Sequence, residues 1–188
     1  MLGYNDLRPG VFFMYEGQPY EVLETHHLKM QQRRPVLQTK MRNLLSGKII
    51  ENNFQQSEMM EEADVEKQNV KYLYTHRDEF WFSEEKDASK RFKLERAVMG
   101  DASGFFKANT IAEALLFNGT VINVQLPIKM DFKVTEAPPA IRGNTAQGGV
   151  KQITIETGAM INVPLFINEG DVIRINTQSG EYVERVSK

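Results

Sequence analysis

Residues 111–126 read Ile-Ala-Glu-Ala-Leu-Leu-Phe-Asn-Gly-Thr-Val-Ile-Asn-Val-Gln-Leu, and this stretch decides the fold class. Two apolar runs flank Asn118-Gly119, a dipeptide that favours the turn twist matching paired strands. A β-hairpin is therefore predicted here. The rest of the chain repeats this pattern of short strands and turns.

The segment before this hairpin predicts a second one. Residues 70–74 and 79–82 are rich in aromatic side chains and flank a turn at 75–78. The charged residues 83–99 end at Gly100, and a helical turn is expected near residues 94–98. We interpret the polar and acidic stretch 55–69 as a strand and a connector into this middle unit.

The first fifty residues predict a small SH3-like barrel. Turn signals at residues 7–10 and 16–19 separate short strands, as in the meanders of small β domains. Residues 36–45 then form a strand whose partner is 48–54. One long hairpin of such a barrel can project beyond its body.

The last third predicts a further barrel. After Pro127, roughly five short strands follow within about sixty residues, which is typical of an oligonucleotide-binding (OB) fold. The middle unit has a similar size and rhythm. We therefore predict an all-β chain of three small barrels, with an SH3-like domain at 1–64 and OB-fold domains at 65–127 and 128–188.

Composition argues against several classes of function. The 188 residues include no cysteine and only three histidines, which excludes disulfides and thiolate nucleophiles and leaves no ligand spacing for a metal. No catalytic triad, paired carboxylates or cofactor loop is recognised, so we expect no enzymatic activity, no metal and no cofactor. No apolar run approaches the ~20 residues of a membrane span, and the first residues do not resemble a signal peptide. A cytoplasmic protein without membrane contact is expected.

Positive charge is concentrated in one stretch, although the net charge is only -2. Between Glu24 and Glu51 there is no acidic residue. The stretch contains instead Lys29, Arg33, Arg34, Lys40, Arg42 and Lys48. Such a run favours a nucleic-acid contact, with a merely solvated hairpin face as the alternative.

Three parts of the chain resemble bacterial elongation factor P. They are residues 6–22, the run 63–66 with Tyr72-Leu73-Tyr74, and the C-terminal third. The string Val-Pro-Leu-Phe-Ile-Asn-Glu-Gly-Asp at 163–171 is specific, and the likeness covers essentially the whole chain.

The resemblance implies both a shape and an activity. The expected protein is L-shaped, of roughly tRNA dimensions, and binds the 70S ribosome as a monomer between the peptidyl-tRNA and exit sites. It promotes peptide-bond formation at stalled sites such as consecutive prolines by positioning the peptidyl-tRNA, while the ribosome performs the chemistry.

The resemblance also implies a contact at the hairpin tip, which reaches the acceptor end of the tRNA. A gapless match places Gln32 at the position where many members carry a lysine that is extended or an arginine that is glycosylated. Gln32 has no amine, so we expect an unmodified tip whose cations are Arg33 and Arg34, with a modified Arg33 as the alternative. The implied tip contact comprises Gln31, Gln32, Arg33 and Arg34, supported by Lys29, Lys40 and Arg42.

Two further contacts are implied near the C-terminus. The first is a loop that resembles the family loop near the exit-site codon of the mRNA, and Asn144 replaces an aspartate of the family there. The second lies in the last strand, where Arg185 is an implied ribosome contact and Tyr182 fits either a contact or the core. The loop residues are Gly143, Asn144, Thr145, Ala146 and Gly148.

Two alternative functions remain open at this point. A paralogue of the same family with a different stall preference is suggested by the unusual tip. A general single-stranded RNA-binding protein would use aromatic side chains of the middle unit as stacking platforms, although aromatics in strands are more often core and the barrels are evenly charged. The candidate platforms are Tyr72, Tyr74, Phe80, Trp81 and Phe82.

Overall fold

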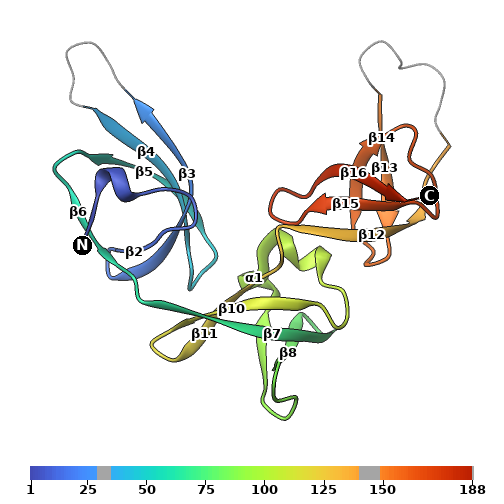
Figure 1. Cartoon of the computed structure of the whole chain (residues 1–188), viewed down its shortest axis with the longest axis horizontal. Coiled ribbons are helices and arrows are strands. Elements are labelled where there is room, and N and C mark those ends of the chain that lie inside the picture. Colours follow the sequence, from blue (N-terminus) through green and yellow to red (C-terminus); the bar gives the residue numbers. More distant parts are fainter. Residues whose placement is uncertain (29–34, 140–148, 188) are drawn as a thin grey trace.

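The computed structural model describes residues 1–28, 35–139 and 149–187 and consists mainly of β-strands (Figure 1). The strands are β1 (Leu2–Gly3), β2 (Phe12–Tyr15), β3 (Gln18–Leu28), β4 (Val36–Asn43), β5 (Ile49–Gln55), β6 (Met59–Glu62), β7 (Val65–His76), β8 (Glu79–Glu84), β9 (Arg91–Glu95), β10 (Ile111–Phe117), β11 (Thr120–Gln125), β12 (Lys129–Glu136), β13 (Val150–Ile155), β14 (Met160–Pro164), β15 (Val172–Asn176) and β16 (Glu181–Ser187). The helical turns are η1 (Tyr4–Asp6), α1 (Arg96–Met99) and η2 (Gly100–Phe105).

These strands form three separate sheets, one after another along the chain. Their orders are β1-β6-β2-β3-β4-β5, then β11-β10-β7-β8-β9, then β14-β13-β12-β15-β16. The three resulting domains follow a bent path (Figure 1). The predicted all-β class with three barrel domains is confirmed. The predicted boundaries after residues 64 and 127 fall between the sheets and stay a prediction.

The N-terminal domain is organised by its long β3–β4 hairpin. Strand β4 alternates strictly, so that Leu37 and Met41 are buried while Lys40 points outward, and β5 pairs along its other edge. This alternation is the period of a strand with one face on a core. The expected strand and its partner are therefore confirmed.

The middle domain contains both predicted hairpins. Asn118 and Gly119 take left-handed conformations, with φ of 51° and 74°, between β10 and β11. Arg77 and Asp78 do the same between β7 and β8. The charged segment 83–99 contains a strand, β9, that the sequence did not predict. Alternating Phe92 and Leu94 allow β9 to pair with β8 before α1 begins.

The middle and C-terminal domains share one continuous hydrophobic core. The rings of Phe105 and Phe132 meet across the boundary, with centroids 5.9 Å apart. Lys107 Nζ donates to Glu156 Oε1 at 2.7 Å at the edge of the same contact. Such packing resists relative motion, because separating the two domains would expose the apolar surface between them.

The N-terminal domain has a core of its own and stands apart from the C-terminal domain (Figure 1). Its contacts with the middle domain include a hydrogen bond from Gln125 to Glu21, at 3.0 Å. Gly47 also approaches the backbone of Ala97, in α1. No hydrophobic cluster among the described residues spans this junction, in contrast to the shared core of the other two domains.

Replacing Gly47 with alanine should disturb this junction. Gly47 has a φ of +72°, and an added Cβ would lie 3.1 Å from the Ala97 carbonyl oxygen. Gly17 is a matched control, because its φ is +76° and an added Cβ would meet nothing within 4 Å. We expect both substitutions to lower the free energy of unfolding by about 1 kcal/mol through backbone strain.

Only Gly47→Ala should also change the distance between the N-terminal and middle domains. Since the chain has no cysteine, a pair introduced in β5 and β10 can carry fluorophores for energy-transfer measurements. Identical transfer efficiency in the two alanine variants would show that Gly47 does not set the junction.

Candidate nucleic-acid interface

The predicted hairpin tip lies outside the residues that the structure describes. This applies to Gln31, Gln32, Arg33 and Arg34, and to the supporting Lys29. The ladder of β3 and β4 extends as far as the pair Leu28 and Val36, immediately beside this segment. The implied tRNA contact of these residues therefore stays a prediction.

The described part of the hairpin is held by an aromatic contact near its outer end. A 2.9 Å hydrogen bond joins the Tyr4 hydroxyl to His27 Nδ1, and the two rings pack edge to face. This contact links β3 to the N-terminal turn η1 and steadies the strand that leads to the tip.

The two described basic residues of the predicted interface each lie near a carboxylate. Lys40 Nζ lies 3.4 Å from Glu24 Oε1, and Arg42 Nη1 lies 4.0 Å from Glu21 Oε2. The register of β3 and β4 brings these carboxylates alongside the cations, although Glu21 and Glu24 lie outside the basic stretch. The base of the hairpin is consequently less positive than the sequence alone indicated.

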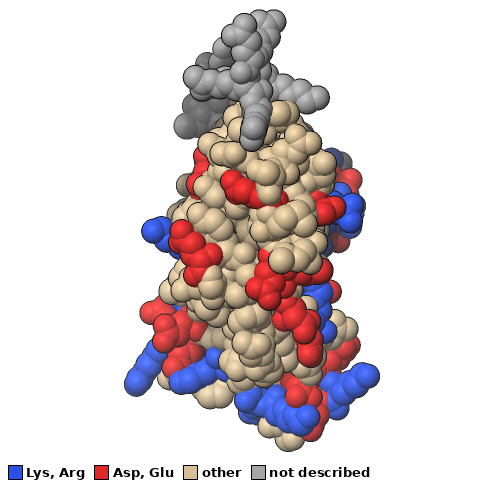
Figure 2. Space-filling model, turned by 90° about the vertical axis from the view of Figure 1, so that its left-hand side faces the viewer, with Lys and Arg blue, Asp and Glu red and all other residues tan. Residues whose placement is uncertain are grey.

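One face of the molecule shows how the charges of the described residues are distributed. Figure 2 shows mostly uncharged side chains with scattered Asp and Glu, while Lys and Arg gather mainly toward the lower end. Among the described residues that this face shows, Lys and Arg do not form a continuous basic surface.

Glu21 is the most buried carboxylate of this region, with a side chain that is 8% exposed. Burial raises its pKa above the ordinary value of 4.5, since desolvation disfavours the charged form, while Arg42 and the Gln125 hydrogen bond act in the opposite direction. Its acceptor role across the junction makes Glu21 a structural residue that the sequence did not reveal. No local sequence signal marks it, because Gln125 is 104 positions away.

Glu21→Gln should stabilise the protein at neutral pH. Because the folded-state pKa of Glu21 is raised, its contribution to stability is fully present below about pH 4.5 and is lost as pH rises through the folded-state pKa. Glutamine mimics the neutral acid and can still accept the hydrogen bond from Gln125. Urea unfolding should show an advantage of the variant at neutral pH that shrinks as pH falls, whereas the exposed Glu24→Gln should show little.

A Glu21→Gln variant that is less stable than the wild type at neutral pH would contradict this expectation. It would mean that attraction between Glu21 and Arg42 outweighs the desolvation of the carboxylate.

The predicted exit-codon loop, with Gly143, Asn144, Thr145, Ala146 and Gly148, also lies outside the described residues. The strands β12 and β13 on either side are paired and register at Val134 and Ile155. The loop's contact with mRNA stays a prediction.

Tyr182 and Arg185 both lie on β16, but in different surroundings. Tyr182 is half-buried and packs against the shared core of the middle and C-terminal domains. Arg185 Nη1 lies 3.6 Å from Asp171 Oδ2, and its guanidinium lies 5.3 Å from the centroid of the Phe166 ring. Phe166 and Asp171 belong to the specific string at 163–171, so this string holds Arg185 in place. Contact of either residue with the ribosome is untested.

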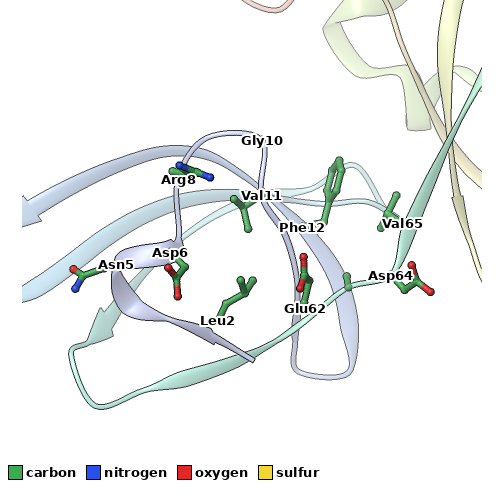
Figure 3. A pocket seen from close by; sticks show the side chains of 11 residues that line it. Leu2, Asn5, Asp6, Arg8, Gly10, Val11, Phe12, Glu62, Asp64 and Val65 are labelled. Atoms are coloured by element: carbon green, nitrogen blue, oxygen red, sulfur yellow. The ribbon is translucent and has the colours of Figure 1, made fainter.

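A pocket of about 690 Å³ opens between η1 and the segment that joins β6 to β7 (Figure 3). Its lining residues include the acidic Asp6, Glu62 and Asp64 and the basic Arg8. Asp6 Oδ2 accepts a hydrogen bond from the Gly3 backbone N–H at 2.8 Å, which indicates a structural role for Asp6. Carboxylates repel phosphate, so this pocket does not extend the predicted RNA interface.

Two further kinds of feature are metal sites and membrane-spanning helices. Within the described ranges, no group of three or more His, Asp or Glu side chains is arranged to hold a metal ion. Among these same residues, none of the helices has the length and apolar character that a membrane crossing requires.

Comparison with protein-family models defines the class of protein. The model described as "Elongation factor P (EF-P) KOW-like domain" matches residues 4–60, and "Elongation factor P, C-terminal" matches residues 130–185. The two matches fall on the first and third sheets. The chain is therefore a β-barrel translation factor that works with the ribosome.

Full-length relatives narrow the class to one family. The elongation factor P of Carboxydothermus hydrogenoformans is 38% identical over 186 residues, covering 99% of this chain and all of the relative. That of Thermodesulfovibrio yellowstonii is 32% identical over 188 residues, with complete coverage of both chains. The chain belongs to the elongation factor P family. A solved structure of translation initiation factor 5A from Methanococcus jannaschii is also similar, at 14% identity and a TM-score of 0.44, over 65% of this chain and 94% of that one.

Proposed function

We propose that this protein binds the ribosome beside the peptidyl-tRNA and promotes peptide-bond formation at stalled sites such as consecutive prolines. The observation that carries the proposal is a 38% identity that spans 99% of this chain and the whole length of an elongation factor P. Because the match extends over all three domains, it supports the activity of the whole factor. A match to one barrel would support only a shared domain.

The proposed mechanism is positional. The protein occupies the space between the peptidyl-tRNA and exit sites of the 70S ribosome as a cytoplasmic monomer, makes no membrane contact and performs no chemistry itself. Orientation of reacting groups can by itself supply a large part of a barrier reduction. The rigid pair formed by the middle and C-terminal domains supports such a role, because it can hold the N-terminal domain at a defined distance from a contact on the C-terminal domain.

The proposed contacts divide between the two ends of the molecule. The hairpin tip meets the acceptor end of the tRNA, with Lys40 and Arg42 as supports. The loop 143–148 meets the exit-site codon of the mRNA. Arg185, with Tyr182 beside it, contacts the ribosome.

The test is full-length synthesis of a reporter that encodes consecutive prolines, with purified ribosomes and with or without the protein made in an unrelated host. We expect full-length product to increase when the unmodified protein is added, and a reporter without the proline run to be unaffected. A matched preparation of heat-unfolded protein serves as control.

The possible failures are distinguishable. Ribosome binding without rescue of the proline reporter would contradict the proposal for the unmodified protein, and a panel of other stalling sequences would then identify a different stall preference. Failure to sediment with 70S ribosomes would contradict the proposal altogether.

A further inference from the structure

An aromatic pair lies on the surface of the middle domain. Tyr74 of β7 is 47% exposed and stacks on Trp81 of β8, with ring centroids 6.0 Å apart and planes inclined by 20°. Lys93 of β9 places its Nζ 5.7 Å from the centroid of the Trp81 ring. The Trp81 indole N–H has no acceptor among the described residues, although such groups usually find one in a folded protein.

Strand alternation and a register shift direct these side chains outward. Phe80 and Phe82 flank Trp81 in the sequence and point into the core, so Trp81 faces out. Tyr72 and Tyr74 would share one face of a regular strand, but the pairing of β7 with β8 shifts register between them. Tyr72 is thereby buried, while Tyr74 lies opposite Trp81. Of the aromatic platforms considered from the sequence, Tyr72, Phe80 and Phe82 are therefore core residues.

Basic side chains lie beside the aromatic pair on the same face. The register places Lys93 opposite Trp81, and Lys71 and Arg91 on the two sides of Ser83. Glu79 pairs with Lys93 and holds its ammonium near the indole ring. Stacking rings accompanied by cations are what single-stranded RNA requires, because bases stack on the rings and phosphates are attracted to the cations.

The position of this face in the barrel points to the same kind of ligand. Strands β8 and β9 are the second and third strands of the middle domain, and α1 follows them before β10. OB-folds bind oligonucleotides on the face of their second and third strands. In Figure 1, β8 lies at the lower end of the middle domain, away from the other two domains.

We infer that the Tyr74–Trp81 face of the middle domain binds unpaired bases of single-stranded RNA. One base stacks on the exposed Tyr74 ring, and Lys71, Arg91 and Lys93 contact the adjacent phosphates. This contact is additional to the hairpin and C-terminal contacts of the proposed function and does not depend on them.

Trp81 supplies a direct measurement, because it is the only tryptophan in the chain. The intact protein is titrated with a 12-nucleotide oligouridine at low salt while its tryptophan fluorescence is recorded. We expect saturable quenching that weakens as salt is added, and no comparable quenching by a double-stranded RNA of the same length. Tyr74→Ala should weaken binding about ten-fold, whereas Tyr74→Phe should restore it, since phenylalanine retains the stacking ring.

Further variants test the charges and the fold. Arg91→Ala should weaken binding and reduce its salt dependence, and Lys93→Ala should do so to a smaller extent, because Glu79 already pairs with the Lys93 ammonium. Lys129→Ala, which removes a lysine of the C-terminal domain, should leave both unchanged. Thermal unfolding of each variant shows whether the domain remains intact.

Absence of quenching up to millimolar oligouridine would overturn the inference, as would quenching that persists unchanged in folded Tyr74→Ala. Quenching by RNA-free ribosomal proteins, without any effect of oligouridine, would assign a protein to this face and would also overturn it. A negative result here leaves rescue of the proline reporter intact, so the two proposals fail separately.

Discussion

Replacing Phe132 with alanine is expected to lower the free energy of unfolding of the middle and C-terminal domains by about 3–5 kcal/mol. Phe132 is fully buried and its ring packs against Phe105 of the neighbouring domain. Truncation removes apolar contacts on both sides of the boundary and leaves a cavity in a core that the two domains share. The two domains should therefore be destabilised together, while the N-terminal domain, with its separate core, should keep its own transition.

Differential scanning calorimetry of the whole chain can separate these transitions. Phe166→Ala is the matched control, because it removes the same ring from a site that is 55% exposed, and we expect it to cost less than about 1 kcal/mol. A loss from Phe132→Ala as small as that from Phe166→Ala would mean that the boundary contact does not couple the two domains.

Replacing both Arg33 and Arg34 with alanine is expected to reduce rescue of the consecutive-proline reporter at least about ten-fold, through loss of two charge-assisted contacts to RNA. The charges of the described residues on the same hairpin support this expectation. Lys40 and Arg42 already lie beside Glu24 and Glu21, so most of the attraction for an anionic partner falls to the cations nearer the tip.

Lys40→Ala is the graded comparison for this prediction, because Lys40 has only a supporting contact in the proposed function. It removes a lysine from the same hairpin, but one whose side chain is 39% exposed and ion-paired to Glu24. We expect its rescue activity to stay within about two-fold of the wild type. Equal losses from Lys40→Ala and from the double variant would show that general charge on the hairpin matters more than the tip.

The local hairpins are the part of the fold that sequence reasoning predicted best. Asn118-Gly119 carries its turn conformation in its own residue types, and the alternation in residues 36–43 assigns each side chain to a face of the sheet. Strand β9 is difficult to predict from the sequence, because only two of its side chains, those of Phe92 and Leu94, are apolar and point inward. It becomes a strand by pairing with β8, which is a tertiary requirement.

The candidate site also has features that the sequence predicts and features that depend on the fold. The resemblance of the string 163–171 was enough to indicate the family, and the family models and relatives confirm it. The roles of the tip and loop residues follow from that resemblance and stay predictions. The neutralisation of Lys40 and Arg42 could not be foreseen from the basic run, because their carboxylate neighbours come from the adjacent strand.

Turn chemistry, alternation and a specific string are local properties, so the all-β class, the three small domains and membership of the elongation factor P family can be predicted from the sequence. Three features cannot be predicted in this way: which domains share a core, which carboxylate is buried at the junction and which aromatic side chains reach the surface. Those features depend on strand register and on contacts between residues far apart in the chain, such as Glu21 with Gln125 and Phe105 with Phe132. The register shift that turns Tyr74 outward while Tyr72 stays buried is one such feature, since both residues are tyrosines in the same strand.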